Sequence, residues 1–536
     1  VPFDAMEQWG STVKRALEEV LAATERGGED GIRRAFSALL RLPSQVLTDS
    51  GRGRGRRVRA RLQRVDNGLE VDIDERADTR RPRRQQNAAH VTAARAHSQL
   101  TLGSITRAVK CLTATPIAEP TVATVETLRA LHPTAPPPAV PESTAAAVTV
   151  TLDTLSDVLL ALPKGSAPGP SGWTYEHIKA ATQAGDSCAL LGVINVIIRG
   201  GLPHVPELLD SRLIGLEKPG GRGLRPIAIG EVFFRLAGLC AMAARPGAGR
   251  ALAPLQLGVG VKGGSQIIGH ALSSGIATNP DCVTVQLDFR NAFNSLSRSA
   301  MLEAVAKRQP AMLPFAAWAY RQPSRLIMTG APEHAAPIMS ECGVRQGDPC
   351  GGLFFSLTTQ DQLETIGLTH PDAAPIAYMD DTFLQGSAAD VTAAFPALCR
   401  LSAAVGLDVR RDKCGVYSPN VQAAQDTAAA LGISHCIDGI TAAGTPVGTD
   451  AFVTAHATSL ADTICRSIDE LLDSPLPTQD KFLILRSSAQ MRLAHLPRTA
   501  PWQLISEAVQ RVEGKAAQAT FRIMQRPEQD DVRYGQ

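Results

Sequence analysis

The sequence predicts an α+β protein with more than one folding unit, and three observations support this. The chain has 536 residues, more than a single hydrophobic core usually accommodates. Between about residues 148 and 420, segments with helical apolar spacing alternate with short strand-like runs. Residues 421–536 carry mainly helical spacing. We expect a mixed unit over 148–420, a helical region over 421–536, and a basic, helical extension over 1–147 with a Pro-rich linker.

Composition narrows the class of protein. Hydrophobic residues make up 44% of the chain and charged residues 20%, which is typical of soluble globular proteins. The net charge of +2 is too small to indicate nucleic-acid binding, so that signal must come from local clusters. The ten cysteines are scattered without a CxxC pair, which predicts reduced thiols in an intracellular protein. The apolar runs are too short to span a bilayer, so no membrane partner is expected. Val1 in place of Met indicates a piece of a longer protein.

Two basic clusters stand out near the N-terminus. Seven arginines lie between Arg52 and Arg64, and "RRPRRQQ" follows from Arg80. One interpretation is a solvated and disordered arm. The other is a phosphate-binding or nuclear-import segment. Composition does not separate the two, and both can hold.

The segment "PIAYMDDTFLQG" places Asp380 and Asp381 side by side between strand-forming residues. Adjacent carboxylates repel, and burial is costly unless a cation is present. Mg²⁺ prefers oxygen ligands and is often held by one or two carboxylates together with substrate phosphates. We therefore expect a hairpin with these aspartates at its tip and a third Asp at the end of a neighbouring strand.

The segment "CVTVQLDFRNAFNSL" supplies that residue. Val283, Val285 and Leu287 alternate as in a strand, and Asp288 follows where the pattern stops. Two strands would then bring carboxylates to one point, as in a two-metal site for phosphoryl transfer. The alternative is that these aspartates are turn residues or helix caps.

The motifs resemble the palm of reverse transcriptases. "YMDD" is preceded by "DFRNAF" and "GVRQGDP", and "LIGLEKPGGRGLRPIAI" and "GLDVRRDKC" occur in the matching order. "APGPSGW" and "RPIAI" are most similar to the enzymes of non-LTR retrotransposons. The resemblance covers roughly residues 150–420. Met379 departs from it, because these enzymes usually carry a small residue before the two aspartates, whereas retroviral enzymes carry Met.

The resemblance implies a right-hand polymerase with fingers, a palm built on a small antiparallel sheet, and a helical thumb after residue 420. It implies that Asp288, Asp380 and Asp381 form the acidic cluster for two Mg²⁺ ions, with Asp381 the least direct ligand. Lys413 would protonate the leaving pyrophosphate; the alternative is a surface lysine. Phe293 would lie beneath the sugar of the incoming nucleotide and exclude a 2′-hydroxyl; the alternative is core packing.

Further positions follow from the same resemblance. Gln346 and Gly347 would approach the template base and incoming nucleotide, unless they form an ordinary turn. Lys218 and Arg225 would clamp the triphosphate; the alternative is a solvated hairpin with two surface cations, and it applies above all to Lys218. Weaker nucleic-acid contacts are expected at the residues Arg345, Arg486 and Arg492. The last two lie in "KFLILRSSAQMRLAHL", for which we predict a continuous thumb helix.

The implied function is an RNA-directed DNA polymerase that copies an RNA template from a DNA or RNA primer with dNTPs. It would act inside the cell, in the nucleus. Two alternatives stay open. One is an RNA-dependent RNA polymerase, which Phe293 and "RPIAI" disfavour. The other is a silent or decayed relative that only binds RNA, against which the intact Asp288, Asp380 and Asp381 argue.

Overall fold

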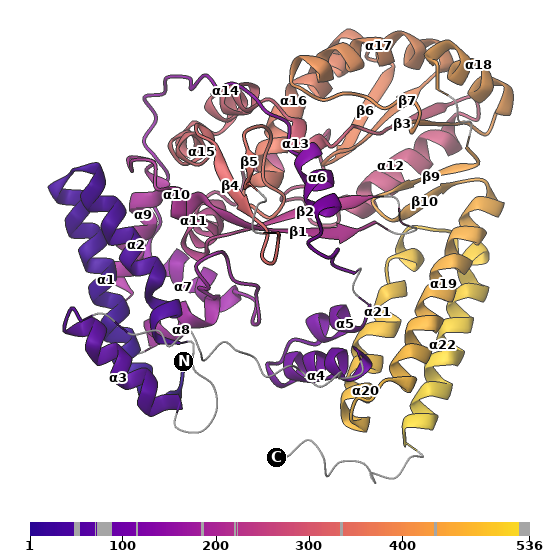
Figure 1. The fold of residues 1–536 in the computed structure, drawn as a ribbon. Coiled ribbons are helices and arrows are strands. Elements are labelled where there is room, and N and C mark those ends of the chain that lie inside the picture. The colour runs from indigo at the N-terminus through magenta and orange to yellow at the C-terminus, as the bar shows by residue number, and fades with distance from the viewer. Residues whose placement is uncertain are drawn as a thin grey trace. The chain divides into compact units, whose positions relative to one another are not determined.

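The computed structural model describes residues 1–47, 54–69, 71, 88–113, 116–183, 187–218, 221, 223–332, 336–433 and 437–524. The chain forms two compact units, and each unit is assembled from separate chain segments. Unit 1 contains Val1–Pro82, Thr115–Ala248 and Asn291–Thr358, and unit 2 contains Arg83–Ala114, Gly249–Arg290 and Thr359–Gln536. Both units combine helices with sheet (Figure 1), so the mixed fold class is confirmed. The predicted extension over 1–147 is divided between the two units.

Unit 1 is mainly helical around one sheet. Its elements are α1 (Met6–Arg26), α2 (Glu29–Val46), α3 (Arg54–Asp66), α6 (Val122–Ala130), α7 (Leu152–Ala161), α8 (Tyr175–Gln183), α9 (Cys188–Ile198), α10 (Pro206–Leu209), β1 (Ser211–Glu217), β2 (Leu224–Gly230), α11 (Val232–Ala243), α13 (Ala292–Ser295), α14 (Arg298–Arg308), α15 (Leu313–Tyr320), β4 (Ser324–Ile327), β5 (Ile338–Ser340) and the first half of α16 (Gly351–Thr369). The strands form one sheet in the order β2-β1-β4-β5.

The first basic cluster forms a folded helix rather than a disordered arm. In α3, Val58 and Leu62 are fully buried, and the helix packs on α1 and α2. Helical spacing then directs the exposed arginines Arg56, Arg57 and Arg64 to the opposite side. Two apolar residues four positions apart therefore fix the helix and leave its basic face in water. The second cluster, Arg80 to Arg84, lies outside the described residues.

Aromatic contacts attach the N-terminal helices to the rest of unit 1. The rings of Trp9 in α1 and Trp173 have centroids 5.3 Å apart, and Trp173 also packs edge-on against Phe233. Both indole N–H groups donate to backbone oxygens, Trp9 to that of His177 and Trp173 to that of Leu39. These buried rings satisfy their polar atoms, as large aromatic core residues usually do.

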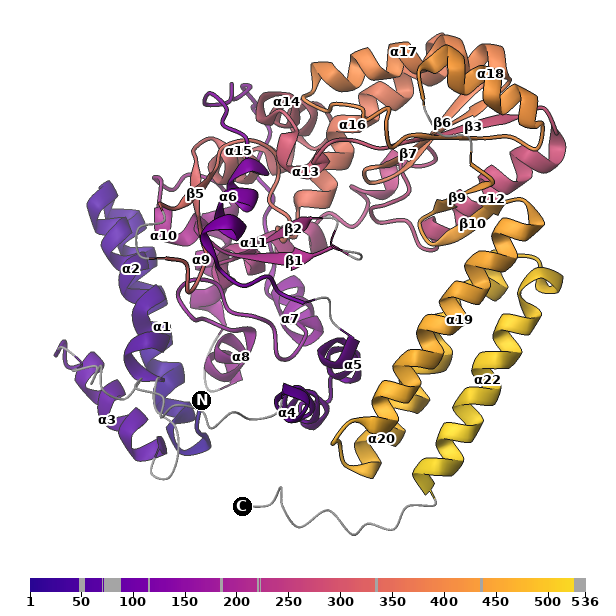
Figure 2. The ribbon, with the colours of Figure 1, turned by 45° about the vertical axis from the view of Figure 1, so that its right-hand side comes forward.

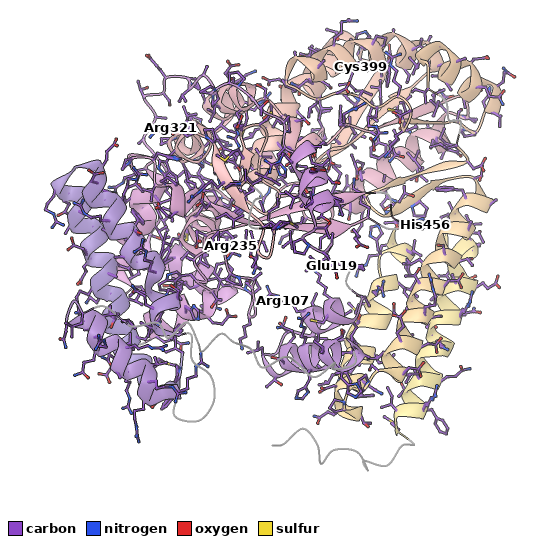
Figure 3. All side chains as sticks on the ribbon, viewed as in Figure 1. Arg107, Glu119, Arg235, Arg321, Cys399 and His456 are labelled. Carbon is purple, nitrogen blue, oxygen red and sulfur yellow. The ribbon has the colours of Figure 1, made fainter. Side chains whose placement is uncertain are left out.

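The "APGPSGW" loop is also held inside unit 1. Glu231, fully buried, accepts hydrogen bonds from the backbone N–H and hydroxyl of Ser171 at 2.6 and 2.5 Å. Arg235, which is labelled in Figure 3, donates to the carbonyl of Ala167 and has its guanidinium over the Tyr175 ring. Burial raises the pKa of Glu231, while the Ser171 bonds favour its charged form. The loop is therefore a fixed part of this unit.

Unit 2 contains two sheets and a helical region. Its elements are α4 (Ala88–Thr101), α5 (Ile105–Thr113), α12 (Gly264–Thr278), β3 (Val283–Leu287), the second half of α16, β6 (Ala373–Tyr378), β7 (Asp381–Gly386), α17 (Ala388–Ala404), β8 (Gly415–Tyr417), α18 (Val421–Leu431), β9 (Gly439–Ala442), β10 (Thr445–Gly448), α19 (Asp450–Asp473), α20 (Thr478–Ile484), α21 (Gln490–Leu493) and α22 (Trp502–Met524). The larger sheet has the order β6-β7-β3-β8, and β9 pairs with β10.

The four-stranded sheet is antiparallel and covered on both faces. Val283, Val285 and Leu384 pack with α17 and α18 on one face. The neighbouring Phe383 points to the other face, where it packs with α12 and the β9–β10 hairpin. Figure 1 shows α17 and α18 along one side of these strands and α12 along the other. Strand alternation thus gives every residue of β3 and β7 a defined face.

The C-terminal helices form a core of their own. α19 and α22 lie side by side along their length (Figure 2), joined by buried residues such as Ala461, Ile464 and Val512. Ala96 and Ala108, from α4 and α5, belong to the same cluster. Helices predominate in the described residues after 420, and the β9–β10 hairpin is an addition to them.

None of the helices in the described part of the chain combines the length and apolar character needed to cross a membrane.

Candidate active site

The two neighbouring aspartates lie at the tip of the β6–β7 hairpin, as predicted. Tyr378 pairs with Asp381 as the last pair of the ladder, so Met379 and Asp380 form a two-residue loop. Met379 has a φ of 58°, a left-handed conformation that favours Gly at such positions. Asp380 and Asp381 are both exposed. The turn therefore presents two carboxylates to solvent at the end of a buried hairpin.

Asp288 reaches the same end of the sheet from the neighbouring strand. β3 and β7 are antiparallel, and their last pair is Leu287 with Thr382. One further step of that register sets Asp288 opposite Asp381. Directly opposed residues project to the same face with Cβ atoms about 4.5–5.5 Å apart. This register agrees with the predicted convergence of carboxylates from two strands, which stays a prediction.

Electrostatics support this proximity. The pKa of Asp381 is raised from its usual 3.8 to about 6, mainly by desolvation and also by the charges of Asp380 and Asp288. Because the side chain is still exposed at one edge, a cation can reach it. A cation there would oppose both effects.

These side chains fit Mg²⁺ as a shared ligand set with a substrate. Within the described residues, no group of three or more His, Cys, Asp or Glu side chains converges closely enough to hold a metal ion on its own. Mg²⁺ usually takes one or two carboxylates and completes its shell with water and substrate phosphates. The acidic tip formed by Asp288, Asp380 and Asp381 meets that requirement in donor type.

Lys413 lies in the segment that runs beside Asp288 in unit 2. Arg410 donates its backbone N–H to the carbonyl of Asp288 at 2.8 Å, and the N–H of Asp288 points to the sulfur of Cys414 at 3.5 Å. Lys413 lies between these two contacts in sequence, and its side chain is exposed. An amine is therefore presented beside the acidic strand end, in agreement with either a catalytic or a surface lysine.

In unit 1, Phe293 occupies the short helix α13. Its ring stacks on Phe355 with centroids 4.7 Å apart, and the side chain is half-buried. The carbonyl of Phe293 accepts a hydrogen bond from Val344, and Asn294 donates to the carbonyl of Leu131. One face of the ring is thus packed while part of it remains open to a ligand.

The Gln346–Gly347 turn is held against β2. The carbonyl of Gln346 accepts a hydrogen bond from the N–H of Ala228 at 2.8 Å. Gly347 has a φ of 129°, and a Cβ there would lie 2.2 Å from the carbonyl oxygen of Ala228. Close backbone approach was predicted for this glycine, and the approach observed in the structure is to β2.

Arg345 differs from its predicted role as a phosphate contact. The side chain is only 4% exposed, and its guanidinium lies over the rings of Phe234 and Tyr320 at 4.6 and 4.9 Å. It donates to the carbonyl of Leu209 and the hydroxyl of Ser324. Arginine is weakly hydrated and stacks well, which suits it to such burial. Here the motif arginine holds the protein interior together.

Lys218 and Arg225 lie at the same end of the β1–β2 hairpin. Arg225 pairs with Leu216 in the ladder, and the N–H of Lys218 donates to the carbonyl of Gly223 across the turn. Both side chains are exposed. The hairpin therefore presents two cations near its tip, where a flexible anionic group can meet both.

Arg486 and Arg492 lie in a segment that departs from the predicted continuous α-helix. Residues Leu485–Ala489 form a π-helical turn between α20 and α21. Arg486 is exposed, whereas Arg492 is half-buried and donates to the hydroxyl of Ser467 at 3.1 Å. The inserted turn changes the helical register, so the two arginines are not equivalent in exposure.

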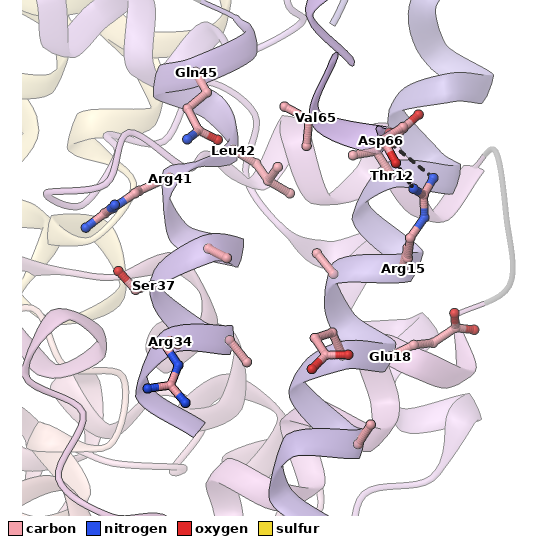
Figure 4. Close-up of a pocket in the computed structure, with 15 residues that line it drawn as sticks. Thr12, Arg15, Glu18, Arg34, Ser37, Arg41, Leu42, Gln45, Val65 and Asp66 are labelled. Atoms are coloured by element: carbon pink, nitrogen blue, oxygen red, sulfur yellow. Dashed lines mark hydrogen bonds and ion pairs between the residues drawn. The ribbon is translucent and has the colours of Figure 1, made fainter. Parts of the chain in front are cut away.

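A surface groove of about 760 Å³ lies between α1 and α2 (Figure 4), where no predicted site residue is found. Arg34 and Arg41 line one side, and Glu18 lines the other. Asp66 accepts a hydrogen bond from Thr12 and pairs with Arg15 at 3.0 Å. The mixed charges do not favour a phosphate backbone in this groove.

Two groups near the motifs gave no sequence signal. One is Gln256, whose side chain bonds to Met379, 123 positions away. The other is a buried network of Arg298, Tyr320 and Asp348 around Arg345. Tyr320 donates to Asp348, and Arg298 donates to the carbonyls of Gly343 and Tyr320. Burial and, to a smaller extent, the charge of Arg345 lower the pKa of Arg298 to about 10.

Comparison with known proteins supports the predicted resemblance. No family model matches the chain. A 132 kDa protein of the retrotransposable element SLACS from Trypanosoma brucei gambiense is 29% identical over 272 residues, which is 48% of this chain. The chain spans 22% of that relative's length. Apo telomerase from Candida tropicalis matches with a TM-score of 0.33 and 10% identity, over 59% of this chain and 62% of the telomerase chain. The similarity to a retrotransposon protein, predicted from the motifs, is confirmed.

Proposed function

We propose that this chain is an RNA-directed DNA polymerase of a retrotransposon. The observation that carries the proposal is the β3–β7 register, whose last pair is Leu287 with Thr382. Continued by one step, this register would set Asp288 opposite Asp381, next to Asp380 at the hairpin tip. The same residues occur in reverse-transcriptase order in the sequence, and the retrotransposon relative supports the assignment. In this proposal the β6-β7-β3-β8 sheet is the palm, α19–α22 form the thumb, and unit 1 supplies the fingers.

The acidic tip would bind two Mg²⁺ ions, with Asp288 and Asp380 as shared ligands and Asp381 adding charge. When bound, such ions lower the pKa of the primer 3′-hydroxyl and stabilise charge on the leaving phosphates. The primer 3′-oxygen forms a bond to the α-phosphorus of the dNTP, the bond to the β-phosphate breaks, and pyrophosphate leaves. Lys413 would give a proton to that pyrophosphate. The protein mainly contributes positioning and charge.

Unit 1 would handle the incoming nucleotide and the template. The open part of the Phe293 ring has no hydrogen-bonding group, so it selects deoxyribose by shape alone. Lys218 and Arg225 would bind the triphosphate from the β1–β2 hairpin, and the Gln346–Gly347 turn would meet the base.

Template and primer would be held through phosphates, since a polymerase must accept any sequence. The exposed arginines of α3 and Arg486 suit this role. RNA and DNA are therefore the proposed partners, and a nuclear location would follow from copying into genomic DNA.

The test is primer extension on poly(rA)/oligo(dT) with Mg²⁺ and dTTP. The wild-type chain should extend the primer. Asp380→Asn should lower extension about 1000-fold or more, because metal charge stabilisation contributes several kcal/mol. Template binding, measured by fluorescence anisotropy, should stay within about twofold.

Asp372→Asn is the matched control, since Asp372 is exposed and precedes β6 at the other end of the same hairpin. It should extend primers like the wild type. Retained extension by Asp380→Asn would contradict the two-metal proposal, and absence of extension by the wild type would favour the RNA-binding alternative.

A further inference from the structure

The turn that carries Asp380 contains a conformation that its own sequence does not favour. Met379 adopts a φ of 58° at the first position of a two-residue hairpin loop. Gly is preferred at such positions, and a non-Gly residue there is strained. Such residues persist only where the surrounding structure over-determines them. Some contact in unit 2 must therefore hold the turn.

That contact is the side-chain amide of Gln256. Its Oε1 accepts the backbone N–H of Met379 at 2.7 Å, and its Nε2 donates to the carbonyl of the same residue at 3.2 Å. The same Oε1 also accepts the N–H of Gly258 at 3.1 Å. Gln256 is fully buried, so these bonds replace water that the amide has lost. One side chain thus fixes both the N–H and the carbonyl of Met379.

The backbone around Gln256 is docked on the hairpin in register. Leu257 donates its N–H to the carbonyl of Ala377 at 2.8 Å, and Ala377 donates to the carbonyl of Leu255 at 2.7 Å. The two segments form a parallel bridge at this point. A Cβ on Gly258 would lie 2.6 Å from both the nitrogen and the Cγ of Met379, so only Gly permits this approach.

We propose that Gln256 is a positioning residue for the catalytic turn. By fixing Met379 in its left-handed conformation, it sets the direction in which the next residue, Asp380, leaves the hairpin. The inference rests on the proposed function for its catalytic consequence, but its structural part is independent of any activity. It also explains how Met is accommodated where related enzymes carry a small residue.

The test compares Gln256→Met with Gln385→Met. Met has a similar length but cannot form the amide bonds. Gln385 is the matched control, because it braces the far end of the same hairpin by donating to Leu272 and Thr284 at 3.0 and 2.9 Å. Melting curves should show that both variants remain folded.

The first readout is hydrogen exchange by mass spectrometry on peptides covering residues 375–386. Exchange at the turn should rise in Gln256→Met, because the N–H of Met379 loses its acceptor. In Gln385→Met any increase should be confined to the other end of the hairpin. Equal exchange at the turn in wild type and Gln256→Met would overturn the proposal, whether or not the protein extends primers.

The second readout is primer extension against Mg²⁺ concentration. Gln256→Met should lower kcat about 10- to 100-fold, the usual effect of losing a group that orients a ligand, with template affinity unchanged. Gln385→Met should stay near wild type. The double variant Gln256→Met with Met379→Gly should regain part of the rate, because Gly adopts positive φ without strain. Equal losses in both single variants, without rescue, would make Gln256 a general packing residue.

If the wild type shows no primer extension, the proposed function fails, and the hydrogen-exchange experiment still tests whether Gln256 holds the turn at Met379. If extension occurs but Gln256→Met matches the wild type in both rate and hydrogen exchange, the positioning role of Gln256 is excluded while the proposed function stands.

Discussion

The acidic tip in unit 2 and the arginine network in unit 1 both contain motif residues, yet their charged groups lie in opposite surroundings. At the tip, the charges acting on Asp381 are two further carboxylates, and all three side chains have access to solvent. Around Arg345, cation, carboxyl and phenol lie together inside the protein, where Arg345 stacks on Tyr320 and its charge lowers the pKa of Asp348 against the effect of burial.

This difference separates two roles that a motif cannot distinguish. A carboxylate that is surrounded by further carboxylates suits the binding of a ligand of opposite charge, here a divalent cation. A group whose charge is compensated internally maintains the fold. The "YMDD" and "RQGDP" motifs look equally functional in sequence, and only burial and contacts assign Asp381 to the first kind and Arg345 to the second.

Removing Arg345 should have the largest effect after loss of Asp380. Arg345→Met removes the stacking on Phe234 and Tyr320 and the hydrogen bonds to Leu209 and Ser324, so the free energy of unfolding should fall by about 1–3 kcal/mol. Calorimetry should show an earlier transition for part of the molecule. Lys218→Met, an exposed cation of the same unit, should shift it by less than about 0.5 kcal/mol. An unchanged melting curve combined with weaker template binding would restore the phosphate-contact prediction.

The sugar-selecting role of Phe293 comes next. Phe293→Val opens space for a 2′-hydroxyl, so the ratio of kcat/KM for dTTP over UTP should fall about 10- to 200-fold, the range for shape discrimination. The loss should come mainly from better use of UTP.

Phe354→Val is the control, because Phe354 is fully buried in the neighbouring α16. It should lower the melting temperature without changing the ratio. If Phe293→Val behaves in the same way, Phe293 is a packing residue and DNA synthesis loses its main argument over RNA synthesis.

A smaller effect is expected from pH. Since the pKa of Asp381 is raised to about 6, protonation below that pH competes with Mg²⁺. The half-saturating Mg²⁺ concentration for extension should rise by up to about tenfold per pH unit below pH 6. In Asp381→Asn this pH dependence should be weaker, and an identical profile would show that another group titrates.

The same raised pKa has a consequence for stability without metal. The folded state binds the Asp381 proton more tightly than the unfolded chain, so its stabilising contribution is complete below pH 3.8 and is lost as the pH rises through about 6. Asp381→Asn should therefore melt at a slightly higher temperature than the wild type at neutral pH without Mg²⁺. Added Mg²⁺ should reduce or reverse that difference.

The smallest effect concerns the exposed face of α3. Replacing Arg56, Arg57 and Arg64 together by Gln should lower the slope of log affinity against log salt by about 2–3, if each neutralises one phosphate. Substitution is sharper than deletion, because removing α3 would expose the surface that Val58 and Leu62 cover. Arg26→Gln is a control, since Arg26 is an exposed arginine at the end of α1, outside α3. An unchanged slope in the triple variant would exclude α3 from the nucleic-acid surface.

The sequence predicted what depends on local pattern. The alternation of apolar residues predicted β3, with Asp288 directly after its last residue. The strand-forming residues on both sides of Asp380 and Asp381 predicted the β6–β7 hairpin with the aspartates at its tip. Contacts between residues far apart in the sequence could not be predicted from local pattern. Nothing near Gln256 indicates a partner at Met379, and nothing near Arg345 indicates burial between two rings. In α3, the two apolar residues Val58 and Leu62 stand among six arginines, too few to predict packing from the sequence, although they decide it.

One contact within unit 2 has consequences for how the protein is made. His97, in α4, lies 2.5 Å from Asp480, in α20, and the two residues are 383 positions apart. At roughly 5–20 residues per second, translation needs on the order of 20–80 s to supply the second partner after the first. During that time the apolar residues of α4 and α5 cannot pack against α19–α22, with which they share a core. C-terminally shortened chains should therefore aggregate more than the full chain when they are expressed. A lower growth temperature or co-expressed chaperones should raise the soluble yield of the full chain more than added salt does.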